Sequence, residues 1–337
     1  MQPLYLVGGE QKNDQTGRDE WHRHRAGVVI RLDPHSQTAE RVLEYQSPPE
    51  CCPDTDPSFL LKASTLRDNT LFACSATEVL IYDFPSMQLR QRISHPCFND
   101  LHHVTPGPDG KLYVASTGLD QVVEMSDAGD ILRQWCVLED RDVWHRHSPD
   151  IDYRKVATTK PHDAHPNYVF FLNDHVWATR CKQRDAICLT DPGRRFQVGN
   201  DRPIHDGVVT DHGIYFTQVD AHVTIVDRDT LQVRENHDLS KMMSGLRRPG
   251  WCRGLHVVDE EHVLVGFSRL RPTKWQKNVG WLKLNELRWL YRLPARVGLF
   301  NLKEQRAVWE IPLQDFGLTT VFSIHPDPQS DAAVNAA

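Results

Sequence analysis

Short apolar segments separated by turn sequences run along the whole chain. The segments are rich in Val, Ile, Leu, Tyr and Phe, which suit the pleated surface of a β-sheet. The turns carry Gly, Pro, Asn, Asp or Glu and stand at Pro108-Asp109-Gly110, Asp127-Ala128-Gly129, Asn173-Asp174, Asp211-His212-Gly213 and Asp259-Glu260-Glu261. Apolar residues at helical spacing are nearly absent. The pattern therefore predicts an all-β protein.

The strand pattern also repeats. Segments 101–134 and 204–233 superpose when LYVAS is placed on IYFTQ, and this aligns His103 with His205 without a gap. Related segments stand at 58–95, 160–198 and 250–311. Each unit consists of an inner strand, a turn, a second strand and a hairpin, so it supplies four strands. Four-stranded units in tandem are typical of the blades of a β-propeller.

The two ends of the chain complete this set. The N-terminal region offers three strands, LYLVGG, GVVIRLDP and ERVLEY, whereas the C-terminal region carries one strand without a partner at 319–326. A ring closes if that last strand becomes the inner strand of the first blade, and closure also removes exposed sheet edges. We therefore predict a single six-bladed β-propeller domain over residues 1–328, followed by a disordered tail at 329–337.

The predicted topology sorts side chains by face. The start of an inner strand and the end of the second strand lie at the same end of a blade, because the two strands are antiparallel neighbours. His103, His165 and His205 stand at or near the starts of inner strands, and Arg180 ends a second strand. We expect these four side chains to converge at one mouth of the central channel.

Three long insertions are expected on that same face, at 9–26, 138–159 and 269–295. The first two each contain the sequence WHRH, whose histidines share one side if the segment is extended. A metal clamp is one reading of WHRH, but we favour a solvated loop or a substrate contact. The third insertion is basic and rich in tryptophan, which suits a lid, a surface for an anionic partner, or packing against the propeller. Loops that lengthen on one side indicate a covered site.

Imidazoles and a guanidinium around one mouth suit an anionic group. Arg binds an oxyanion through two N–H groups, and His can donate, accept or attack. Lys62 aligns with His103 in the second repeat and favours an anion pocket, since a cation repels a metal ion. We expect Lys62, Arg253, His162 and His256 to contact the substrate.

Two other interpretations of the same histidines stay open. In the first, His103, His165, His205 and His256 ligate a transition metal, because neutral imidazoles suit Zn, Fe or Cu. In the second, each histidine only hydrogen-bonds the backbone of a neighbouring blade or an ordered water in the channel. The recurrence of histidine at matched positions favours a functional role over this structural one.

Composition narrows the classes of function. The chain has 337 residues, of which 39% are hydrophobic and 25% charged, with a formal net charge of -6. These proportions are typical of a globular protein, and the negative charge argues against a general nucleic-acid binder. No apolar run approaches the roughly 18 residues of a membrane span, so we expect a soluble, cytoplasmic protein. The eight cysteines include no CxxC pair and are expected to be reduced.

Several common catalytic signatures are missing from the sequence. It contains no GxSxG elbow, no GxxxxGK[ST] loop, no GxGxxG after a strand and no HExxH. Serine-hydrolase chemistry and a nucleotide phosphate cradle are therefore disfavoured.

Three consecutive repeats resemble blades of the aryl sulfotransferase-like six-bladed propellers. Segment 101–135 has the paired histidines, the PDG turn and the closing Gln-Trp of one blade of that family. The next repeat, HPNYVFFLNDHVWATR, is similar to the family's His-x-Asn unit, which ends in Arg. The third, IHDGVVTDHGIYFTQ, is similar to the unit that begins with His-Asp. The resemblance implies that His205 accepts a sulfuryl group and that His103, His165 and Arg180 bind the oxyanion. It also implies transfer between phenolic donors and acceptors without a nucleotide donor or a metal.

Our leading hypothesis is an enzyme that transfers a sulfate-like group through a covalent His205 intermediate, with Arg180 stabilising the charge. The alternatives are a metal-dependent propeller hydrolase or oxygenase and a propeller that binds a ligand or protein without catalysis. For the leading hypothesis we expect no cofactor and an anionic or aromatic small molecule as the partner, with neither nucleic acid nor membrane.

Overall fold

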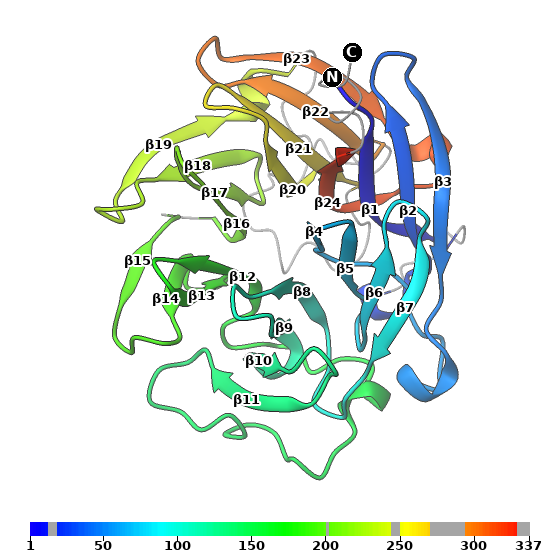
Figure 1. The fold of residues 1–337 in the computed structure, drawn as a ribbon, viewed down its shortest axis with the longest axis vertical. Coiled ribbons are helices and arrows are strands. Elements are labelled where there is room, and N and C mark those ends of the chain that lie inside the picture. Colours follow the sequence, from blue (N-terminus) through cyan, green and yellow to red (C-terminus); the bar gives the residue numbers. More distant parts are fainter. Residues whose placement is uncertain (13–18, 200–201, 244–249, 270–293, 329–337) are drawn as a thin grey trace, which may run out of the picture.

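A computed structural model describes residues 1–12, 19–199, 202–243, 250–269 and 294–328. In this part of the chain, six four-stranded antiparallel sheets stand around a central axis (Figure 1). Apart from Pro328, the last described residue, the described helical residues form short 3-10 turns. These turns are η1 (Glu20–His22), η2 (Pro49–Cys51), η3 (Thr117–Leu119), η4 (Tyr153–Lys155), η5 (Leu239–Lys241) and η8 (Gln314–Phe316). The predicted six-bladed β-propeller is confirmed.

The blades follow one another along the chain, and the strands of each blade are arranged from the central channel outward. In this order, the first three blades are β24 (Thr320–Pro326), β1 (Leu4–Gln11), β2 (His24–Asp33) and β3 (Thr38–Tyr45); β4 (Thr65–Arg67), β5 (Thr70–Cys74), β6 (Val79–Asp83) and β7 (Gln88–Ile93); β8 (Leu101–Pro106), β9 (Leu112–Ser116), β10 (Gln121–Met125) and β11 (Ile131–Cys136). The last three are β12 (Pro166–Leu172), β13 (His175–Arg180), β14 (Asp185–Cys188) and β15 (Arg195–Gln197); β16 (Ile204–Thr210), β17 (Gly213–Gln218), β18 (His222–Val226) and β19 (Val233–Asp238); β20 (Trp251–Val257), β21 (His262–Ser268), β22 (Arg296–Asn301) and β23 (Arg306–Pro312).

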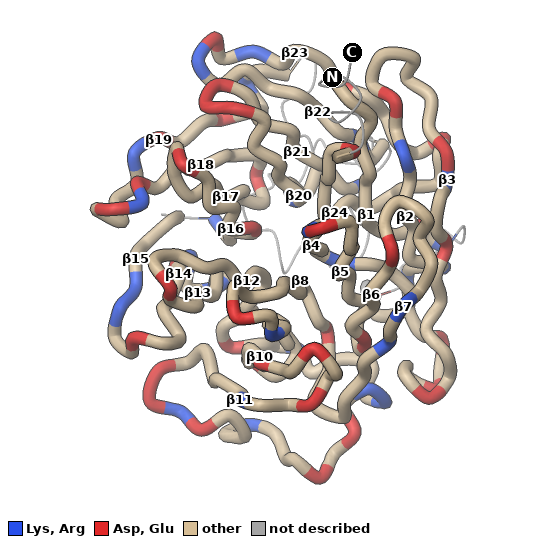
Figure 2. The backbone as a smooth tube through the Cα atoms, in the orientation of Figure 1, with Lys and Arg blue, Asp and Glu red and all other residues tan. Residues whose placement is uncertain are grey.

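Burial falls from the inner strands to the outer ones. Every residue of β8 and β9 is buried, whereas β19 is mostly exposed. Strands that are covered on both faces read as continuous apolar runs, and outer strands carry polar residues toward solvent. Figure 2 shows Lys, Arg, Asp and Glu at many points of the outer strands and rim loops. No described helix has the length and apolar character needed to cross a membrane.

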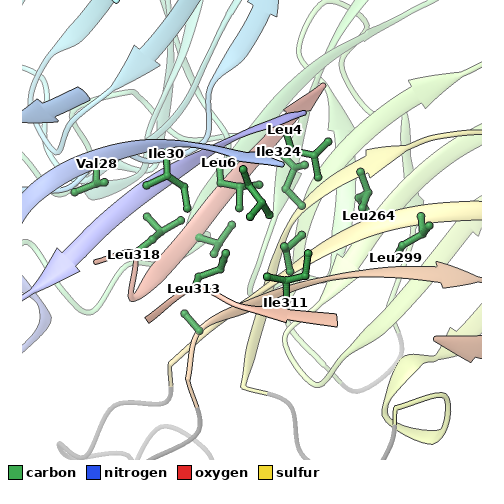
Figure 3. Packing of buried hydrophobic residues seen from close by; sticks show 14 of the residues in the cluster. Leu4, Leu6, Val28, Ile30, Leu264, Leu299, Ile311, Leu313, Leu318 and Ile324 are labelled. Carbon is green, nitrogen blue, oxygen red and sulfur yellow. The ribbon is translucent and has the colours of Figure 1, made fainter. Parts of the chain in front are cut away.

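The ring closes as predicted, because β24 pairs with β1 in an antiparallel ladder that includes Leu6 opposite Ile324. A cluster of buried aliphatic side chains then joins the first and last blades (Figure 3). Leu4, Leu6 and Ile324 of the first blade pack in it with Leu264 and Leu299 of the last. Burying one such side chain contributes about 1.5–3 kcal/mol, so this seam stabilises the closed ring.

Five inner strands carry a register shift near their starts. In each, extra residues stand opposite the second strand: His102 in β8, Asn167 in β12, Asp206 and Gly207 in β16, Gly254 in β20 and Phe322 in β24. A bulge of this kind changes the direction of side chains and is common beside functional sites. Asp206 and Gly254 have φ of 63° and 74°, in the left-handed region. The bulges therefore form a layer of irregular backbone around the central axis, near the starts of the inner strands.

Some segments for which the sequence made predictions lie wholly or partly outside the residues that the structure describes. Most of the basic insertion at 269–295 and the tail at 329–337 lie outside the described residues, as does part of the 9–26 insertion.

Candidate functional site

The loop before β12 is held by one buried carboxylate. Asp120 accepts the backbone N–H groups of Asp163, Ala164 and His165 at 2.7, 2.9 and 2.7 Å. His165 has φ of 59°, a left-handed conformation that costs free energy in a residue with a side chain. Because three hydrogen bonds converge on Asp120, this conformation is fixed and the imidazole of His165 is directed by its backbone.

Arg146, from the second WHRH sequence, braces the same loop. Its guanidinium donates to the Pro161 carbonyl at 2.8 Å, and it lies 3.1 Å from a carboxylate oxygen of Asp163. It also lies 3.7 Å from Asp120. Arg146 thus has a structural role beside the site, and the 138–159 insertion contacts the loop as expected from the topology.

Three side chains at the channel mouth can hold a metal ion together. One ligand atom from each of Asp100, His162 and His165 lies within 4.8 Å of the others. The Nδ1 atoms of His162 and His165 face each other at 2.9 Å. Two ring nitrogens at this distance share either a proton or an ion. Asp100 comes from the loop before β8, so two neighbouring blades supply the cluster.

The tautomer of His162 follows from its neighbours. The hydroxyl of Thr159 donates to the Gly118 carbonyl at 2.5 Å, which leaves its oxygen lone pairs free to accept. The Nε2 of His162 lies 3.3 Å from that hydroxyl and is the donor of this pair. In the neutral ring, Nδ1 therefore carries the lone pair that faces His165. A hydrogen bond that fixes one ring nitrogen and leaves the other as a ligand is usual in metal sites.

His102 adds a further free nitrogen. Its Nδ1 lies 2.7 Å from the Asp100 carbonyl, which can only accept, so Nδ1 carries the proton and Nε2 the lone pair. The His102 ring lies 4.7 Å from the His165 ring, centroid to centroid. Lys62 forms an ion pair with the Asp100 carboxylate and lies 3.4 Å from His102. The cluster therefore contains one cation, one carboxylate and three imidazoles.

Burial keeps these imidazoles neutral. It lowers the pKa of His102 and of His165 well below the usual value, and nearby Lys62 lowers that of His102 further. Burial raises the pKa of Asp100, but Lys62 and the adjacent histidines outweigh it and leave that pKa below its ordinary value. Neutral imidazoles beside an ionised carboxylate are the protonation states in which these groups bind a metal.

His205 lies at the edge of the cluster, with its ring centroid 6.4 Å from that of His165. The Asn167 amide nitrogen donates to the Ile204 carbonyl at 2.7 Å and to His205 Nδ1 at 2.8 Å. In the neutral ring the proton of His205 therefore resides on Nε2. Burial keeps the pKa of His205 well below its usual value, with a further lowering by Arg253. The side chain can donate a hydrogen bond from Nε2.

Arg253 completes the mouth. Its guanidinium carbon lies 4.7 Å from the Phe322 ring centroid and 5.6 Å from that of Trp251. The Phe322 ring in turn lies 6.4 Å from the ring of His102. Arg253 is buried, and its Nε has no hydrogen-bond partner among the described residues. Cationic and stacking contacts thus hold the guanidinium, rather than an ion pair.

The structure does not place His103 with the other predicted residues. Its ring stacks on Tyr168 at 3.7 Å, and its Nδ1 accepts the Val169 N–H at 3.1 Å. Its Nε2 lies 3.2 Å from the hydroxyl of Thr65. His103 and His205 do lie opposite matched residues, Ala115 and Thr217, but the bulge precedes His103 in β8 and follows His205 in β16, so matched positions do not direct their side chains alike. His103 joins neighbouring inner strands instead of lining the mouth.

Arg180 also differs from the prediction. It forms a two-point ion pair with Asp185, at 2.8 Å from Nε and 2.5 Å from Nη2, and donates to the Val137 carbonyl at 2.9 Å. These contacts occupy the guanidinium, so Arg180 links β13 to β14 and to the preceding blade. It is a structural residue and does not reach the cluster.

His256 stands farther along its inner strand. It influences His325 electrostatically, and burial lowers the pKa of His256 to about 4. His325 contacts the Ser64 hydroxyl at 2.8 Å. His256 is therefore absent from the cluster, and the predicted metal set of His103, His165, His205 and His256 is not brought together.

The first WHRH sequence is not a fully solvated loop. His24 begins β2 and is buried, with Nε2 3.0 Å from the Thr320 hydroxyl and Nδ1 3.1 Å from that of Ser58. Arg23 is buried as well. This segment contributes to packing near the mouth.

Sequence reasoning missed Asp100 and His102, and it expected His162 to contact the substrate rather than to belong to a metal-ligand set. His102 was visible as half of a His-His pair. Asp100 stands two residues before it, at the same point of its repeat as the loop before β12. A search for carboxylates ahead of every inner strand would have found it.

No protein-family model matches the chain, and no curated protein matches its sequence. Among solved structures, a protein of unknown function from Bacteroides caccae has a TM-score of 0.59 at 11% identity and covers 97% of this chain and 100% of its own. A Bacteroides uniformis protein assigned provisionally as a 6-phosphogluconolactonase has a TM-score of 0.50 at 12% identity, with 93% and 83% covered. The virginiamycin B lyase of Staphylococcus aureus gives 0.47 at 14%, with 92% and 89% covered. Identities this low support the fold alone.

Proposed function

We propose that this propeller is a metal-dependent hydrolase whose ion is bound by Asp100, His162 and His165. The observation that carries the proposal is the convergence of their ligand atoms within 4.8 Å, with two imidazole nitrogens face to face at 2.9 Å. One carboxylate with two imidazoles is a ligand set that zinc and iron enzymes use.

The distances fit a single ion. Metal–nitrogen bonds of about 2.0–2.1 Å place two ligands of one ion about 3.0–3.5 Å apart. The separation of the His162 and His165 nitrogens, 2.9 Å, lies close to that range. The ligand atom of Asp100 lies within 4.8 Å of those of the two histidines, so the carboxylate must move closer to complete the set. His102 lies beside this set, with its ring centroid 4.7 Å from that of His165.

Lys62 is the group that argues against a cation at this site. Its ammonium pairs with Oδ1 of Asp100, while Oδ2 is the atom closer to His162. A carboxylate can serve both cations through its two oxygens. The expected cost is a lower metal affinity, because two positive charges share one carboxylate.

The surrounding residues suit hydrolysis. When bound, the ion would lower the pKa of a coordinated water and polarise the bond to be cleaved. Hydrolysis bonds the water oxygen to the electrophilic centre, and the leaving group takes up a proton. The leaving group takes up the proton that the water loses, and the Nε2–H of His205 can donate a hydrogen bond to the charge that develops on it.

The proposal is tested by metal titration and by activity. We expect metal-stripped protein to bind one zinc ion, and His162→Ala and Asp100→Asn to lose at least about 100-fold in affinity. His212→Ala, at an exposed turn, is the matched control and should bind as the wild type does. Wild-type protein that takes up neither zinc, iron nor manganese would refute the proposal.

Activity is measured with 4-nitrophenyl acetate, 4-nitrophenyl phosphate and γ-butyrolactone. The lactone is included because of the provisional assignment of the Bacteroides uniformis protein. We expect turnover of at least one class that depends on metal and disappears in His162→Ala. Metal-dependent oxygen consumption with no hydrolysis would instead favour the oxygenase alternative.

A second candidate function is transfer of a sulfate-like group, and Arg253 and Lys62 beside three imidazoles are the observation in its favour. An imidazole nitrogen would bond to sulfur as the S–O bond to the phenol breaks, and an acceptor oxygen would then displace the imidazole. His205 is less suited to this role than expected, because Asn167 occupies Nδ1 and the proton occupies Nε2. Transfer from 4-nitrophenyl sulfate to phenol, abolished by His205→Ala and indifferent to chelators, would support this candidate.

A further inference from the structure

Arg253 stands out among the buried arginines. Arg180, buried to a similar degree, is fully used by Asp185 and a carbonyl, and Arg296 pairs with Glu310. Arg253 makes no hydrogen bond and no ion pair with any described residue, although only 8% of its surface is exposed. A buried guanidinium is costly unless an anion compensates it. The cost indicates that the partner comes from outside the chain.

Nearby carboxylates do not supply the missing charge. Asp206 receives the Thr217 hydroxyl and the Gly254 N–H, and burial raises its pKa to about 6. Asp100 is already paired with Lys62. Neither carboxylate forms an ion pair with Arg253 in the described part of the chain, so its N–H groups remain available.

The guanidinium is nevertheless held in place. Phe322 and Trp251 lie against it at 4.7 and 5.6 Å, and stacking of this kind fixes a guanidinium without using its N–H donors. Its charge acts on His24, His102 and His205, whose pKa values it helps to lower. Arg253 therefore lies at the same end of the ring as the proposed metal ligands, and its positive charge acts on the histidines there.

We propose that Arg253 is the subsite for an oxyanion of the substrate, either a carboxylate or a phosphate-type group, placed beside the bond to be cleaved. The planar guanidinium binds such a group through two parallel N–H donors. That the bound molecule is a substrate rests on the proposed function, whereas the oxyanion site itself rests on Arg253 alone.

The test is a calorimetric titration of metal-stripped protein with inorganic phosphate and, separately, with acetate. We expect the wild type to bind at least one of them, Arg253→Met to bind at least about tenfold more weakly, and Arg253→Lys to lie between the two. Arg90→Met is the matched control, because Arg90 pairs with Asp83 on the outer strands. It should bind as the wild type does. Tighter binding of phosphate would identify a phosphate-type group as the ligand, and tighter binding of acetate would identify a carboxylate.

Each outcome decides one claim. Unchanged phosphate and acetate binding in Arg253→Met, or no binding of either probe by wild type, would overturn the oxyanion site. Zinc titration of Arg253→Met is run in parallel and should match the wild type. Arg253-dependent anion binding without any zinc binding would leave the subsite standing and remove the metal-dependent function. A folded Arg253→Lys that binds the probe weakly excludes misfolding as the cause.

Discussion

The side-chain amide of Asn167 lies 2.8 Å from Nδ1 of His205 and decides which nitrogen of that ring carries the proton. The same amide nitrogen donates to the Ile204 carbonyl, so its orientation is not interchangeable with that of the amide oxygen. One residue from the bulge of β12 thus sets the hydrogen-bonding role of a residue in β16. In the neutral ring, the Nε2–H of His205 is therefore a hydrogen-bond donor.

Asn167→Asp should reverse this tautomer. An aspartate at this position accepts from Nδ1–H, which transfers the ring proton from Nε2 to Nδ1. Nitrogen NMR of labelled His205 should show the Nε2–H form in the wild type and the Nδ1–H form in the variant. An Nδ1–H signal in the wild type would contradict the assignment. The Ile204 carbonyl also loses its donor, so we expect a stability loss of about 1–3 kcal/mol.

Thr159→Val should weaken metal binding, although Thr159 is not itself a proposed ligand. The substitution keeps the shape but removes the oxygen that accepts from His162 Nε2, so the ring loses the contact that keeps its lone pair toward His165. Such outer contacts are worth about 10–100-fold in metal affinity. Thr190→Val, whose hydroxyl contacts His175 at 3.0 Å on another part of the fold, is the control. Equal zinc affinity in both variants would argue against this arrangement.

Lys62→Met should have the opposite effect. It removes the cation that shares the Asp100 carboxylate, so zinc should bind about tenfold more tightly. Lys111→Met removes a lysine that pairs with Glu124 at 2.6 Å, away from the cluster, and should leave zinc binding unchanged. Weaker zinc binding in Lys62→Met would mean that Lys62 orients Asp100 for the ion.

Arg253→Met and Arg180→Met should affect stability differently. Methionine at 253 removes a buried charge that no described residue compensates, so the free energy of unfolding should stay equal or rise in ligand-free protein. Methionine at 180 leaves the Asp185 carboxylate buried and uncompensated, which typically costs about 3–5 kcal/mol. Urea unfolding of both variants measures the difference. A large loss for Arg253→Met would show that the guanidinium has a structural role.

Buried histidines should make the protein sensitive to mild acid. Burial lowers the pKa of His24 and of His325 to about 3, against an ordinary value of 6.5 in the unfolded chain. A depressed folded pKa means that the unfolded state binds the extra proton, so the stabilisation is complete above pH 6.5 and is lost as pH falls toward 3. Each such histidine costs about 1.4 kcal/mol per pH unit in that window.

Urea unfolding between pH 7 and 4 checks this dependence. We expect His24→Asn to flatten the loss of stability with acid, whereas the exposed His212→Ala should follow the wild type. Parallel curves for His24→Asn and wild type would show that His24 is not kept neutral in the folded protein.

The fold was predictable from the sequence because each blade repeats the same order of strands and turns, and the strand at 319–326 had no other partner. Local periodicity encodes which residues form strands, and counting strands at both ends identifies the closure. Neither inference requires the positions of individual side chains.

The site was predictable only in part. His165 and Lys62 do lie at the mouth, but His102 was passed over for His103 because a sequence repeat carries no mark of a bulge that adds one residue. Arg180 was assigned to the mouth because it ends a second strand, and no local pattern indicates that Asp185, which lies opposite it in β14, occupies its guanidinium. The positions of these side chains depend on hydrogen bonds between segments far apart in the sequence, such as those that Asp120 accepts from the loop before β12. No local sequence pattern indicates such hydrogen bonds.

The pairing of β1 with β24 has a consequence for the order in which the molecule can form. Leu6 is synthesised before the intervening blades, and Ile324, which stands opposite it, follows only after all of them. Until then one edge of β1 has exposed N–H and C=O groups that any other strand can bind. Successful folding during synthesis therefore depends on keeping that edge unoccupied until β24 arrives.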